Sequence, residues 1–591
     1  MNFKVAGYRF IKGFAFGSRS PIILVSLSGN FDPNEDFNDR LRYTLRIIAG
    51  QDSKAWLATI GKYLNQKDLL ATAANCASIE CDPQVIGALL HAQLPEPSIT
   101  SHDAQIWVPV THQRIASRVV STILSMLNTA RITDKSQLES STKTFANILA
   151  RKPPRPVEAS ITNHPLLLRA AYELDIPVYQ LNEFHAILGH GDQQRHFRST
   201  LTDKTKALGT DVALSKYRTA QYLRELSLPV PKQFLPRTAK QAIEQFKRMA
   251  RPAVIKPDHL DRGEGVHTNL TSEVEIKQAF NTVATMSHRV VMEPHYSGFA
   301  HRLTVYEGKV IKAVKRMPAG VTGDGFSTIA QLIQQRATQS SVQEKAGRHK
   351  GYLLNLDEIA LNMLTKSDLT PDHIPDRGKF IRLRPTDNLS TGGSNSLLDI
   401  ERDVHPDNIA IALKAAEVLG LDFAGVDILS KDFSTAWYDN GAVIGEVNVI
   451  PQIGEGTTPV IYKEVLSGAL PNGGCIDLEL IVLDEKLHSF GSLDKVSDTS
   501  GISSSHGVWV GNNCAAKRVD NSFTAARTLL LTNNVSKATC IMTPQDVLAH
   551  GLPSPYCTKI EVKSYSETNK QVLEQLLRPH TEDLIFSSPK M

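Results

Sequence analysis

The sequence is short of cysteine and of long apolar runs, and each shortage excludes a class of protein. Only six of the 591 residues are cysteines, and 6% are aromatic. No apolar run approaches the ~20 residues that a membrane-spanning helix needs. The 65 basic residues nearly balance the 61 acidic ones, and a net charge of +4 gives no argument for a nucleic acid or a membrane as partner. We therefore expect an ordinary globular chain of several domains.

The cysteines match neither a redox motif nor a zinc site. Only Cys76 and Cys81 lie close together, and no second pair follows at a zinc-binding distance. We therefore predict reduced, structural thiols in a reducing compartment. The start of the chain has basic residues but no sustained apolar stretch and no small-residue cleavage site, which predicts mature sequence in the cytoplasm.

Several catalytic motifs are also missing. The sequence has no Walker phosphate loop, no Gly-x-Gly-x-x-Gly, no His-Glu-x-x-His and no nucleophile elbow. Strands and helices alternate from about 160 to 470, which predicts an α/β or α+β fold. The proline-rich basic segment 150–156 predicts a domain boundary, and the composition changes again near 475.

Apolar periodicity and capping residues predict the main elements of secondary structure. The expected helices are 39–49, 115–130, 216–226, 408–419 and 522–532. The expected strands are 177–181, 253–256, 302–306, 309–316, 421–429, 442–450, 475–482 and 538–542.

Two of these strands carry polar side chains among apolar ones. Glu446 and Asn448 lie two residues apart, so both point to one face of their strand, and Asp427 interrupts the strand 421–429. Burying such groups is costly unless something satisfies them. If the strands pair, three oxygen ligands converge, which suits Mg²⁺ together with substrate phosphates. A solvated sheet face is the alternative that the spacing leaves open.

Three charged residues at strand positions are candidates for nucleotide or substrate binding. Lys256 ends a strand before a loop that runs to Gly265, and such a lysine can bind phosphates where backbone N–H groups approach closely. Glu293 could mark the contact with an adenine, and Arg302 could bind a carboxylate or a phosphate. For each of the three, an ordinary surface charge is the alternative.

A polar loop at 383–394 is a candidate anion site. Its polar and small residues are Arg384, Ser390, Thr391, Gly392 and Gly393. Backbone N–H groups of such a loop can form an anion-binding nest. A surface turn is the alternative.

Seven segments, taken in order, resemble the ATP-grasp ligases and, more closely, the ATP-grasp module of the cyanophycin synthetases. The resemblance covers roughly residues 160–460. The segments are GHGDQQRHFRSTLTDKT (189–205), VIKPDHLDRGEGV (254–266), GKVIKAVKRMPAGVTGDGFSTI (308–329), LRPTDNLSTGGS (383–394), VHPDN (404–408), AGVDIL (424–429) and GEVNVIPQIGEG (445–456). The resemblance implies an ATP-grasp fold within the α/β and α+β multidomain class.

The resemblance also implies roles for ATP and Mg²⁺ ligands. Lys216 and Lys256 would hold ATP phosphates, and Gly263 and Gly265 would lie in a lid loop. Glu293 would contact the adenine. The implied Mg²⁺ ligands are Asp427, Glu446 and Asn448.

For the carboxyl substrate, the resemblance implies that Arg302 stabilises an acyl phosphate. Arg384 and the loop Ser390–Gly393 would receive the substrate carboxylate. Lys315 and Arg316 lie on opposite faces of their strand, and of the two we expect Lys315 to face ATP.

The sequence departs from this family in two places and resembles it again near the C-terminus. Ala300 stands where an acidic residue is usual, and the lid loop 261–265 lacks a usual histidine–glycine pair. The segments 501–511, 525–531 and 547–557 resemble pieces of the Mur-ligase half of cyanophycin synthetase. Because its phosphate loop and its remainder are missing, we expect an inactive, truncated Mur-like domain that serves scaffolding or oligomer contact.

Together these observations predict three domains and one reaction. We expect an N-terminal domain at 1–155, an ATP-grasp domain at 156–474 with a lid at about 230–300, and the Mur-like domain at 475–591. The expected enzyme is an ATP-dependent carboxylate–amine ligase that joins amino acids or dipeptides such as β-aspartyl-arginine, and that forms a dimer or tetramer. A small-peptide ligase of the glutamylcysteine or acetylglutaminylglutamine type and a non-catalytic nucleotide-binding scaffold are the alternatives.

Overall fold

A computed structural model describes most of the chain as two compact units. The described residues are 3–29, 35–49, 98–99, 103–110, 113–150, 163–182, 184–249, 252–260, 263–338, 354–384, 393–453, 460–484 and 497–587. Unit 1 comprises Met1–Ser199 and Pro459–Met591, and unit 2 comprises Thr200–Thr458. Each unit is described by itself.

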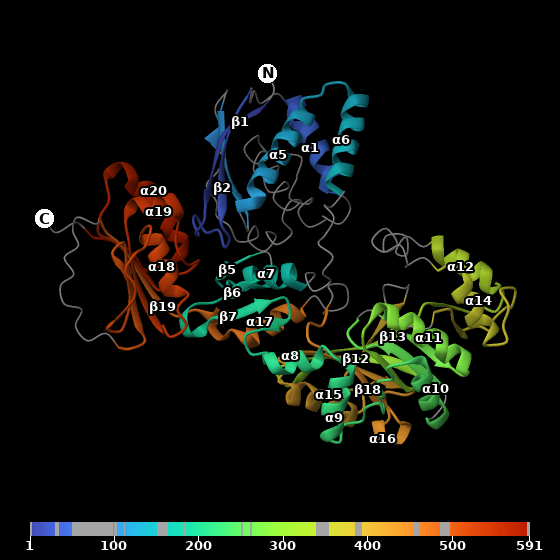
Figure 1. Cartoon of the computed structure of the whole chain (residues 1–591). Helices are drawn as coiled ribbons and strands as arrows, with labels where there is room; N and C mark the ends of the chain where they lie inside the picture. The colour runs from blue at the N-terminus through green and yellow to red at the C-terminus, as the bar shows by residue number, and fades with distance from the viewer. Residues whose placement is uncertain are drawn as a thin grey trace. The chain divides into compact units, whose positions relative to one another are not determined.

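Unit 1 begins with an antiparallel sheet that is covered by helices. The strands β1 (Lys4–Ile11), β2 (Ile22–Ser28), β3 (Ser98–Ile99) and β4 (Asp103–Pro109) lie in the order β1-β2-β4-β3. The helices α1 (Glu35–Ala49), α5 (Gln113–Ala130) and α6 (Lys135–Ala150) lie together beside this sheet (Figure 1). Alternate residues of β2, such as Ile23, Val25 and Leu27, are fully buried in the shared core.

Short elements of unit 1 come from both of its chain segments. These are α7 (Asn163–Glu173), β5 (Val178–Gln180), β6 (Ala186–Leu188), β7 (Arg195–Arg198) and α17 (Ile461–Ala469). The two helices are joined by a hydrogen bond of 3.0 Å from the Tyr462 hydroxyl to Asn163 Oδ1.

A mostly parallel, seven-stranded sheet completes unit 1. Its strands are β19 (Asp477–Val482), β20 (Ser500–Ser504), β21 (Gly507–Val510), β22 (Asn513–Ala516), β23 (Lys537–Met542), β24 (Lys559–Val562) and β25 (Leu584–Phe586), in the order β22-β21-β20-β23-β19-β24-β25. The helices that alternate with these strands are α18 (Ser522–Leu530), α19 (Pro544–His550) and α20 (Glu567–Leu577). Parallel strands need such crossovers. Along β23 every second residue, namely Ala538, Cys540 and Met542, is buried in the core, and the residues between them are half-buried.

An antiparallel five-stranded sheet forms the centre of unit 2. Its strands are β12 (Phe299–Tyr306), β13 (Lys309–Met317), β16 (Ser394–Leu398), β17 (Phe423–Ser430) and β18 (Val443–Asn448), in the order β16-β13-β12-β17-β18. Its core packs on α15 (Pro406–Leu419), which begins after His405 and ends at Gly420 with a left-handed φ of 62°. The same unit contains β8 (Leu201–Thr202), α8 (Ala207–Ala213), α9 (Lys216–Glu225) and α16 (Trp437–Asn440).

One extra residue interrupts the pairing of β17 with β18. Asp427 pairs with Glu446, but the next residue of β17, Ile428, pairs with Ile444. Gly445 is therefore left over as a β-bulge. Because of this bulge, Ile444 and Val447 both reach the same core although they are three positions apart, a spacing that would put them on opposite faces of a regular strand.

Two smaller layers belong to the same unit. The strands β10 (His267–Leu270), β9 (Ala253–Pro257) and β11 (Val290–Pro294) form an antiparallel sheet, which packs on α10 (Ala239–Arg248) and α11 (Glu273–Met286). A second layer pairs β14 (Gly320–Thr322) with β15 (Phe380–Arg382) beside α12 (Ile329–Thr338) and α14 (Glu358–Thr365).

The expected mixed α/β, multidomain class is confirmed, and each expected element appears with its ends shifted by a few residues. No helix among the described residues is long and apolar enough to cross a membrane. Four described cysteines have free thiols, namely Cys475, Cys514, Cys540 and Cys557, whereas Cys76 and Cys81 lie outside the described residues. The division into domains at 155 and 474 stays a prediction, because the two compact units follow other boundaries.

Candidate active site

The register of three neighbouring strands gathers the candidate metal ligands on one face of the five-stranded sheet. Asp427 lies directly opposite Arg302 of β12 on one side and Glu446 of β18 on the other, and Asn448 lies opposite Gly425. Directly opposite residues share a face, so all four polar side chains point away from the apolar core beneath α15. The convergence that the sequence predicted for Asp427, Glu446 and Asn448 agrees with this register. The role of the three residues in metal binding stays a prediction.

Asp427 is buried and held by two guanidinium groups. Arg302 donates from Nε to Oδ1 at 2.5 Å and from Nη2 to Oδ2 at 2.7 Å, and Arg316 Nη1 lies 3.4 Å from Oδ2. Burial by itself raises the pKa of Asp427, but the charges of Arg302 and Arg316 outweigh burial and lower it. Asp427 is thus an anion throughout the physiological pH range.

Arg316, and not Lys315, lies on the face that carries Asp427. Lys315 therefore does not lie beside the candidate metal ligands, and the expectation that it faces ATP stays a prediction. Lys315 pairs with His301 on the opposite face, where its ammonium group lies 4.1 Å from the centre of the Phe299 ring. The alternation along β13 separates the two residues, and the register with β12 decides which of them faces the carboxylates.

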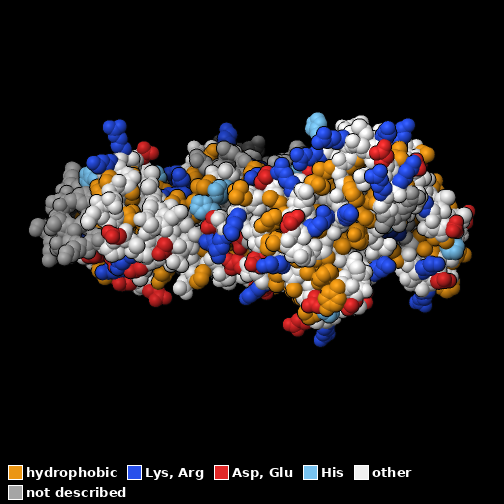
Figure 2. Space-filling view, turned by 60° about the horizontal axis from the view of Figure 1, so that its bottom comes forward, with side chains coloured by type: hydrophobic (Ala, Val, Ile, Leu, Met, Phe, Trp, Pro, Cys, Tyr) orange, Lys and Arg blue, Asp and Glu red, His pale blue; other side chains and the backbone are white. Residues whose placement is uncertain are grey.

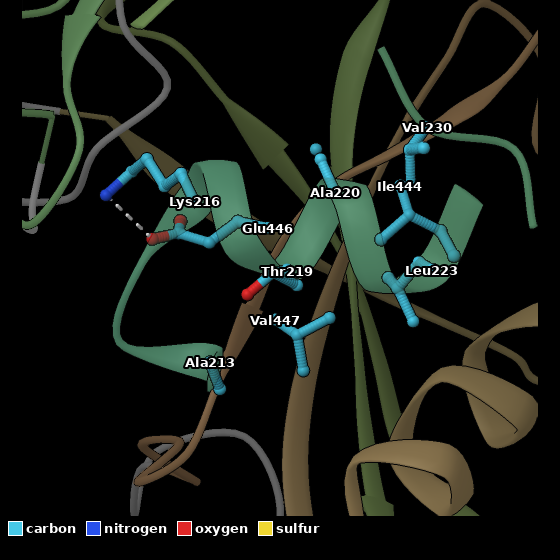
Figure 3. A pocket seen from close by; sticks show the side chains of 10 residues that line it. Ala213, Lys216, Thr219, Ala220, Leu223, Val230, Ile444, Glu446 and Val447 are labelled. Carbon is cyan, nitrogen blue, oxygen red and sulfur yellow. Dashed lines mark ion pairs between the residues drawn. The ribbon is translucent and has the colours of Figure 1, made fainter. Parts of the chain in front are cut away.

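Lys216 lies beside Glu446 at the start of α9. Its Nζ lies 3.4 Å from Glu446 Oε1 and donates to the carbonyl of Leu260 at 2.6 Å. Figure 3 shows the two side chains meeting at one end of a crevice whose lining includes Ala213, Thr219 and Val447. Lys216 thus joins the candidate metal ligand to the segment that follows β9.

The start of α9 is fixed by a fully buried aspartate. Asp258 accepts hydrogen bonds from the Ser215 hydroxyl at 2.8 Å and from the Tyr217 backbone at 2.9 Å. Ser215 caps the helix by accepting from Arg218 N. Because these bonds orient the first turn of α9, they also orient Lys216.

Lys256 of β9 and Glu293 of β11 form a buried ion pair in the three-stranded sheet of unit 2. Lys256 Nζ lies 2.7 Å from Glu293 Oε1, and Gln233 Nε2 donates to Glu293 Oε2, also at 2.7 Å. These three side chains are 4–7% exposed. The sequence singled out Lys256 and Glu293 separately, and the structure brings them together.

The glycines of the expected lid have the backbone freedom that a tight loop needs. Gly263 and Gly265 adopt φ values of 73° and 68°, which other residues rarely adopt. A Cβ atom at Gly265 would lie 3.3 Å from the ring of Pro257. The loop therefore folds back against the end of β9, and residues 261–262 lie outside the described chain.

Arg384 is occupied by a carboxylate of the chain itself. Its Nη1 and Nη2 donate to Asp357 Oδ1 and Oδ2 at 3.0 and 2.7 Å, and the residue is 8% exposed. The expected role in binding a substrate carboxylate would require Asp357 to be displaced. Gly393 is buried just before β16, whereas Ser390, Thr391 and Gly392 lie outside the described residues.

Sequence reasoning missed three residues of this region: Gln233, Asp357 and Lys312. Lys312 lies opposite Thr304, on the face of Arg302, and donates to the carbonyl of Ile453. Burial lowers the pKa of Lys312. Lys312 lies two residues before Val314 and four before Arg316, so alternation along the strand places all three on one face. The regular spacing of lysines at 309, 312 and 315 obscures this pattern.

The donor set of the sheet face suits a hard cation. In the part of the chain that the structure describes, no three His, Cys, Asp or Glu side chains gather as a metal site. The candidate site instead has two carboxylates and the Asn448 amide, whose nitrogen donates to the Gly425 carbonyl at 3.3 Å. That bond turns the amide oxygen away from Gly425, so oxygen is the atom offered to a cation. Mg²⁺ takes such oxygen ligands, with one or two carboxylates plus substrate phosphates.

Comparison with known proteins supports the resemblance that the sequence motifs indicated. The chain is 33% identical over 295 residues to the cyanophycin synthetase of Trichormus variabilis, a match that covers 48% of this chain and 32% of that protein. It is 33% identical over 269 residues to the cyanophycin synthetase of Geminocystis herdmanii, covering 45% and 30%. A third relative is the glutathione biosynthesis bifunctional protein GshAB of Streptococcus agalactiae, at 28% over 242 residues, covering 40% and 32%. The matches thus span about a third of the length of each relative.

Among solved structures, the chain resembles a bifunctional glutathione synthetase from Pasteurella multocida with a TM-score of 0.39 and 19% identity, covering 61% of this chain and 52% of that one. A D-alanine–D-alanine ligase from Bacillus anthracis matches with a TM-score of 0.30 and 14% identity, covering 46% and 70%. Both TM-scores lie below 0.5. No protein-family model matches the chain.

Proposed function

We propose that the chain is an ATP-dependent carboxylate–amine ligase, which forms an amide bond through an acyl-phosphate intermediate. The observation that carries the proposal is the convergence of Asp427, Glu446 and Asn448 beside Arg302 on one sheet face. The similarity to cyanophycin synthetases supports it from the sequence. A solvated sheet face does not account for the site, because Asp427 and Arg302 are only 6% and 9% exposed.

In this proposal ATP transfers its terminal phosphoryl group to a substrate carboxylate, and an amine then displaces the phosphate. Mg²⁺ held by Asp427, Glu446 and Asn448 would supply charge neutralisation at the phosphate oxygens. Lys216 and Lys256 would bind phosphates, because the ammonium group of each lies at a candidate site residue, Glu446 for Lys216 and Glu293 for Lys256.

Two guanidinium groups would stabilise the negative charge of the transition state. Arg302 and Arg316 are already positioned by Asp427, so they need little reorganisation when charge develops nearby. The loop at Gly263 and Gly265 would exclude water from the acyl phosphate, which water would otherwise hydrolyse.

The substrates are proposed to be amino acids or short peptides, with β-aspartyl-arginine as the leading dipeptide. A small-peptide ligase is the second candidate, and the 28% identity to the glutathione biosynthesis protein favours it. The proposal also includes a cytoplasmic location, a dimer or tetramer, and a scaffolding role for the mostly parallel sheet at 477–586.

The experiment that tests the proposal is ADP release from ATP and Mg²⁺ with a panel of amino acids and dipeptides, followed by mass spectrometry of the products. Substrate-dependent ADP release with equimolar amide product supports a ligase. A repeating mass ladder indicates a polymerase, and a single condensation product indicates a small-peptide ligase. Nucleotide binding without turnover on any member of the panel would favour the non-catalytic scaffold.

A further inference from the structure

Two distant parts of the chain meet in unit 1, away from the candidate metal ligands of unit 2. The backbone of Gly13, just after β1, donates to the carbonyl of His550 at 2.7 Å. A Cβ atom at Gly13 would lie 2.7 Å from the ring of Phe523, so the chain passes close against that ring. Lys12, the preceding residue, is therefore held beside α18, the helix that carries Phe523.

A second cation, Arg527, lies one turn further along the same helix. Its guanidinium carbon lies 5.8 Å from the centre of the Phe523 ring and 5.0 Å from that of the Tyr179 ring. Such cation–π contacts hold the guanidinium group but use none of its hydrogen-bond donors. Burial and the charge of Arg527 both lower the pKa of Lys12, so the two cations lie close together.

Neither cation has a counter-charge within the described part of the chain. There, no carboxylate forms an ion pair with Lys12 or Arg527, and no acceptor takes a hydrogen bond from either. Burial lowers the pKa of Arg527, and the one acidic group that opposes this effect is the Tyr179 phenol. Burial raises the pKa of that phenol well above its ordinary value, and its hydroxyl donates to the Pro553 carbonyl at 2.8 Å. Tyr179 thus stays neutral and does not compensate the pair.

Both cations can be reached from solvent. Lys12 is exposed, and Arg527 is half-buried. None of the Arg527 nitrogens belongs to the fully buried polar atoms that lack a partner, so each keeps some contact with solvent. Two like charges held together in this way repel each other, and the repulsion is relieved when an anion binds between them.

The charges and the donors indicate which anion fits. A guanidinium group can offer two parallel N–H groups to two oxygens of one anion, and an ammonium group adds a compact point charge. A carboxylate would balance only one of the two cations. A phosphate group carries about −1.5 to −2 charges at pH 7 and has three strong acceptor oxygens, so it can balance both cations and contact both.

We propose that Lys12 and Arg527 form a binding site for a phosphate group, either free inorganic phosphate or the phosphate of a monoester. Both residues belong to unit 1, whereas the proposed active site lies in unit 2. The inference therefore does not rest on the proposed function.

The test is protection of Lys12 from acetylation by acetic anhydride. The whole chain is treated briefly at pH 8, and peptide mass spectrometry measures the acetylation rate of each lysine. Inorganic phosphate should slow the acetylation of Lys12 at least about fivefold, with half of the effect at or below about 1 mM. Sodium chloride at the same ionic strength should leave the rate nearly unchanged. Lys570, which also lies over aromatic rings, is the internal control and should not be protected.

Removing the guanidinium group should abolish the protection. In Arg527→Gln, phosphate should change the Lys12 rate by less than about 1.5-fold, because one exposed ammonium group binds phosphate weakly. Arg578→Gln, which removes an arginine paired with Glu574 in the same unit, is the matched control and should keep the wild-type protection. Equal protection in wild type and Arg527→Gln, or no protection in the wild type, would overturn the proposal.

Two further anions identify the ligand class. Acetate should protect Lys12 at least about fivefold less than phosphate at the same concentration, and equal protection would overturn the assignment to phosphate. Glycerol 3-phosphate distinguishes the two sources: protection by this ester supports a monoester ligand, and protection by inorganic phosphate alone supports the free ion.

A second variant keeps the proposal testable if Arg527→Gln does not fold. Lys12 is exposed, so Lys12→Gln should fold normally. Phosphate should then raise the melting temperature of the wild type more than that of Lys12→Gln, since phosphate bound elsewhere acts on both proteins alike. An equal rise in the two proteins would contradict the site.

Discussion

Arg302 and Asp427 lie directly opposite each other on β12 and β17 and form a two-point ion pair, with N···O distances of 2.5 and 2.7 Å. Arg316 approaches the same carboxylate at 3.4 Å. One anion therefore balances two buried or half-buried cations. This arrangement makes Asp427 important for folding as well as for the proposed chemistry.

Asp427→Asn should destabilise unit 2 even in the absence of any ligand. The amide keeps the shape of the side chain but leaves the two guanidinium groups without a counter-charge. Breaking a buried pair in this way typically costs about 3–5 kcal/mol. Urea unfolding in EDTA measures the loss, with Asp439→Asn, an exposed residue of the same unit, as the control. A change below about 1 kcal/mol would show that the pair contributes little.

Glu446→Gln should abolish turnover without affecting the fold. Glu446 is half-buried and lies at the edge strand β18, so its charge is not needed by the core. We expect ADP release to fall by at least about a hundredfold, as loss of a charged transition-state contact implies. The melting temperature should change by no more than about 2 °C. Glu417→Gln on α15 is the matched control. Normal amide synthesis by Glu446→Gln would refute the metal assignment.

Arg316→Gln and Lys315→Gln, two neighbouring changes of the same kind, should behave differently. Arg316 faces Asp427, whereas Lys315 stacks on Phe299 on the opposite face. ADP release should fall about tenfold to a hundredfold in Arg316→Gln and less than about twofold in Lys315→Gln. The reverse order of effects would instead support the expectation that Lys315 faces ATP.

Unit 1 should lose stability when the pH falls below 6.5. His580 is buried, accepts from Gly17 N at 3.0 Å and donates from Nδ1 to the Pro555 carbonyl at 2.7 Å, so only its neutral form satisfies both contacts. Burial, together with the charge of nearby Arg19, lowers the pKa of His580 from 6.5 to about 4, against the opposing effect of the hydrogen bond to Pro555.

Between these two pKa values the unfolded chain binds a proton that the folded chain does not, so the free energy of unfolding falls as the pH falls. Buried His164, with a pKa of about 4, acts in the same direction. Urea midpoints at pH 7.5 and 5 should differ more for the wild type than for His580→Leu. His506→Leu, an exposed position, should keep the wild-type difference. If the urea midpoint changed equally between pH 7.5 and 5 in all three proteins, His580 would not contribute to the pH dependence of stability.

The thiols of unit 1 should differ sharply in reactivity. Cys514 is exposed, whereas Cys540 and Cys557 are buried. Burial raises the pKa of Cys540 to about 12, and it also raises that of Cys557, so neither forms the reactive thiolate. Iodoacetamide followed by peptide mass spectrometry should label Cys514 in the native protein and the other two only in denaturant. Rapid native labelling of Cys540 would contradict the buried environment.

Local patterns in the sequence were sufficient to predict much of the site. Alternation along a strand placed Glu446 and Asn448 on one face, and the pairing of β17 with β18 adds Asp427 to it. The cap at Ser215 predicted the start of α9 and hence the position of Lys216. These inferences depend on neighbours in the chain or on the pairing of two strands, which is why the sequence alone could predict them.

Contacts between distant segments could not be predicted from the sequence in the same way. The choice between Lys315 and Arg316 depends on the register with β12. The partner of Arg384 lies 27 residues earlier, at Asp357. Gln233 reaches Glu293 through an isolated bridge 60 residues away in the sequence. No local periodicity reports such pairings, because they arise from tertiary packing.

The leftover residue at Gly445 divides β18 into two halves with opposite phase. Before it, even-numbered side chains point to the apolar interior, and after it the odd-numbered ones do. Removing this one position would either turn the acidic and amide groups inward or expel Ile444 to the outside. This strand should therefore tolerate substitutions more readily than the insertion or deletion of a single residue.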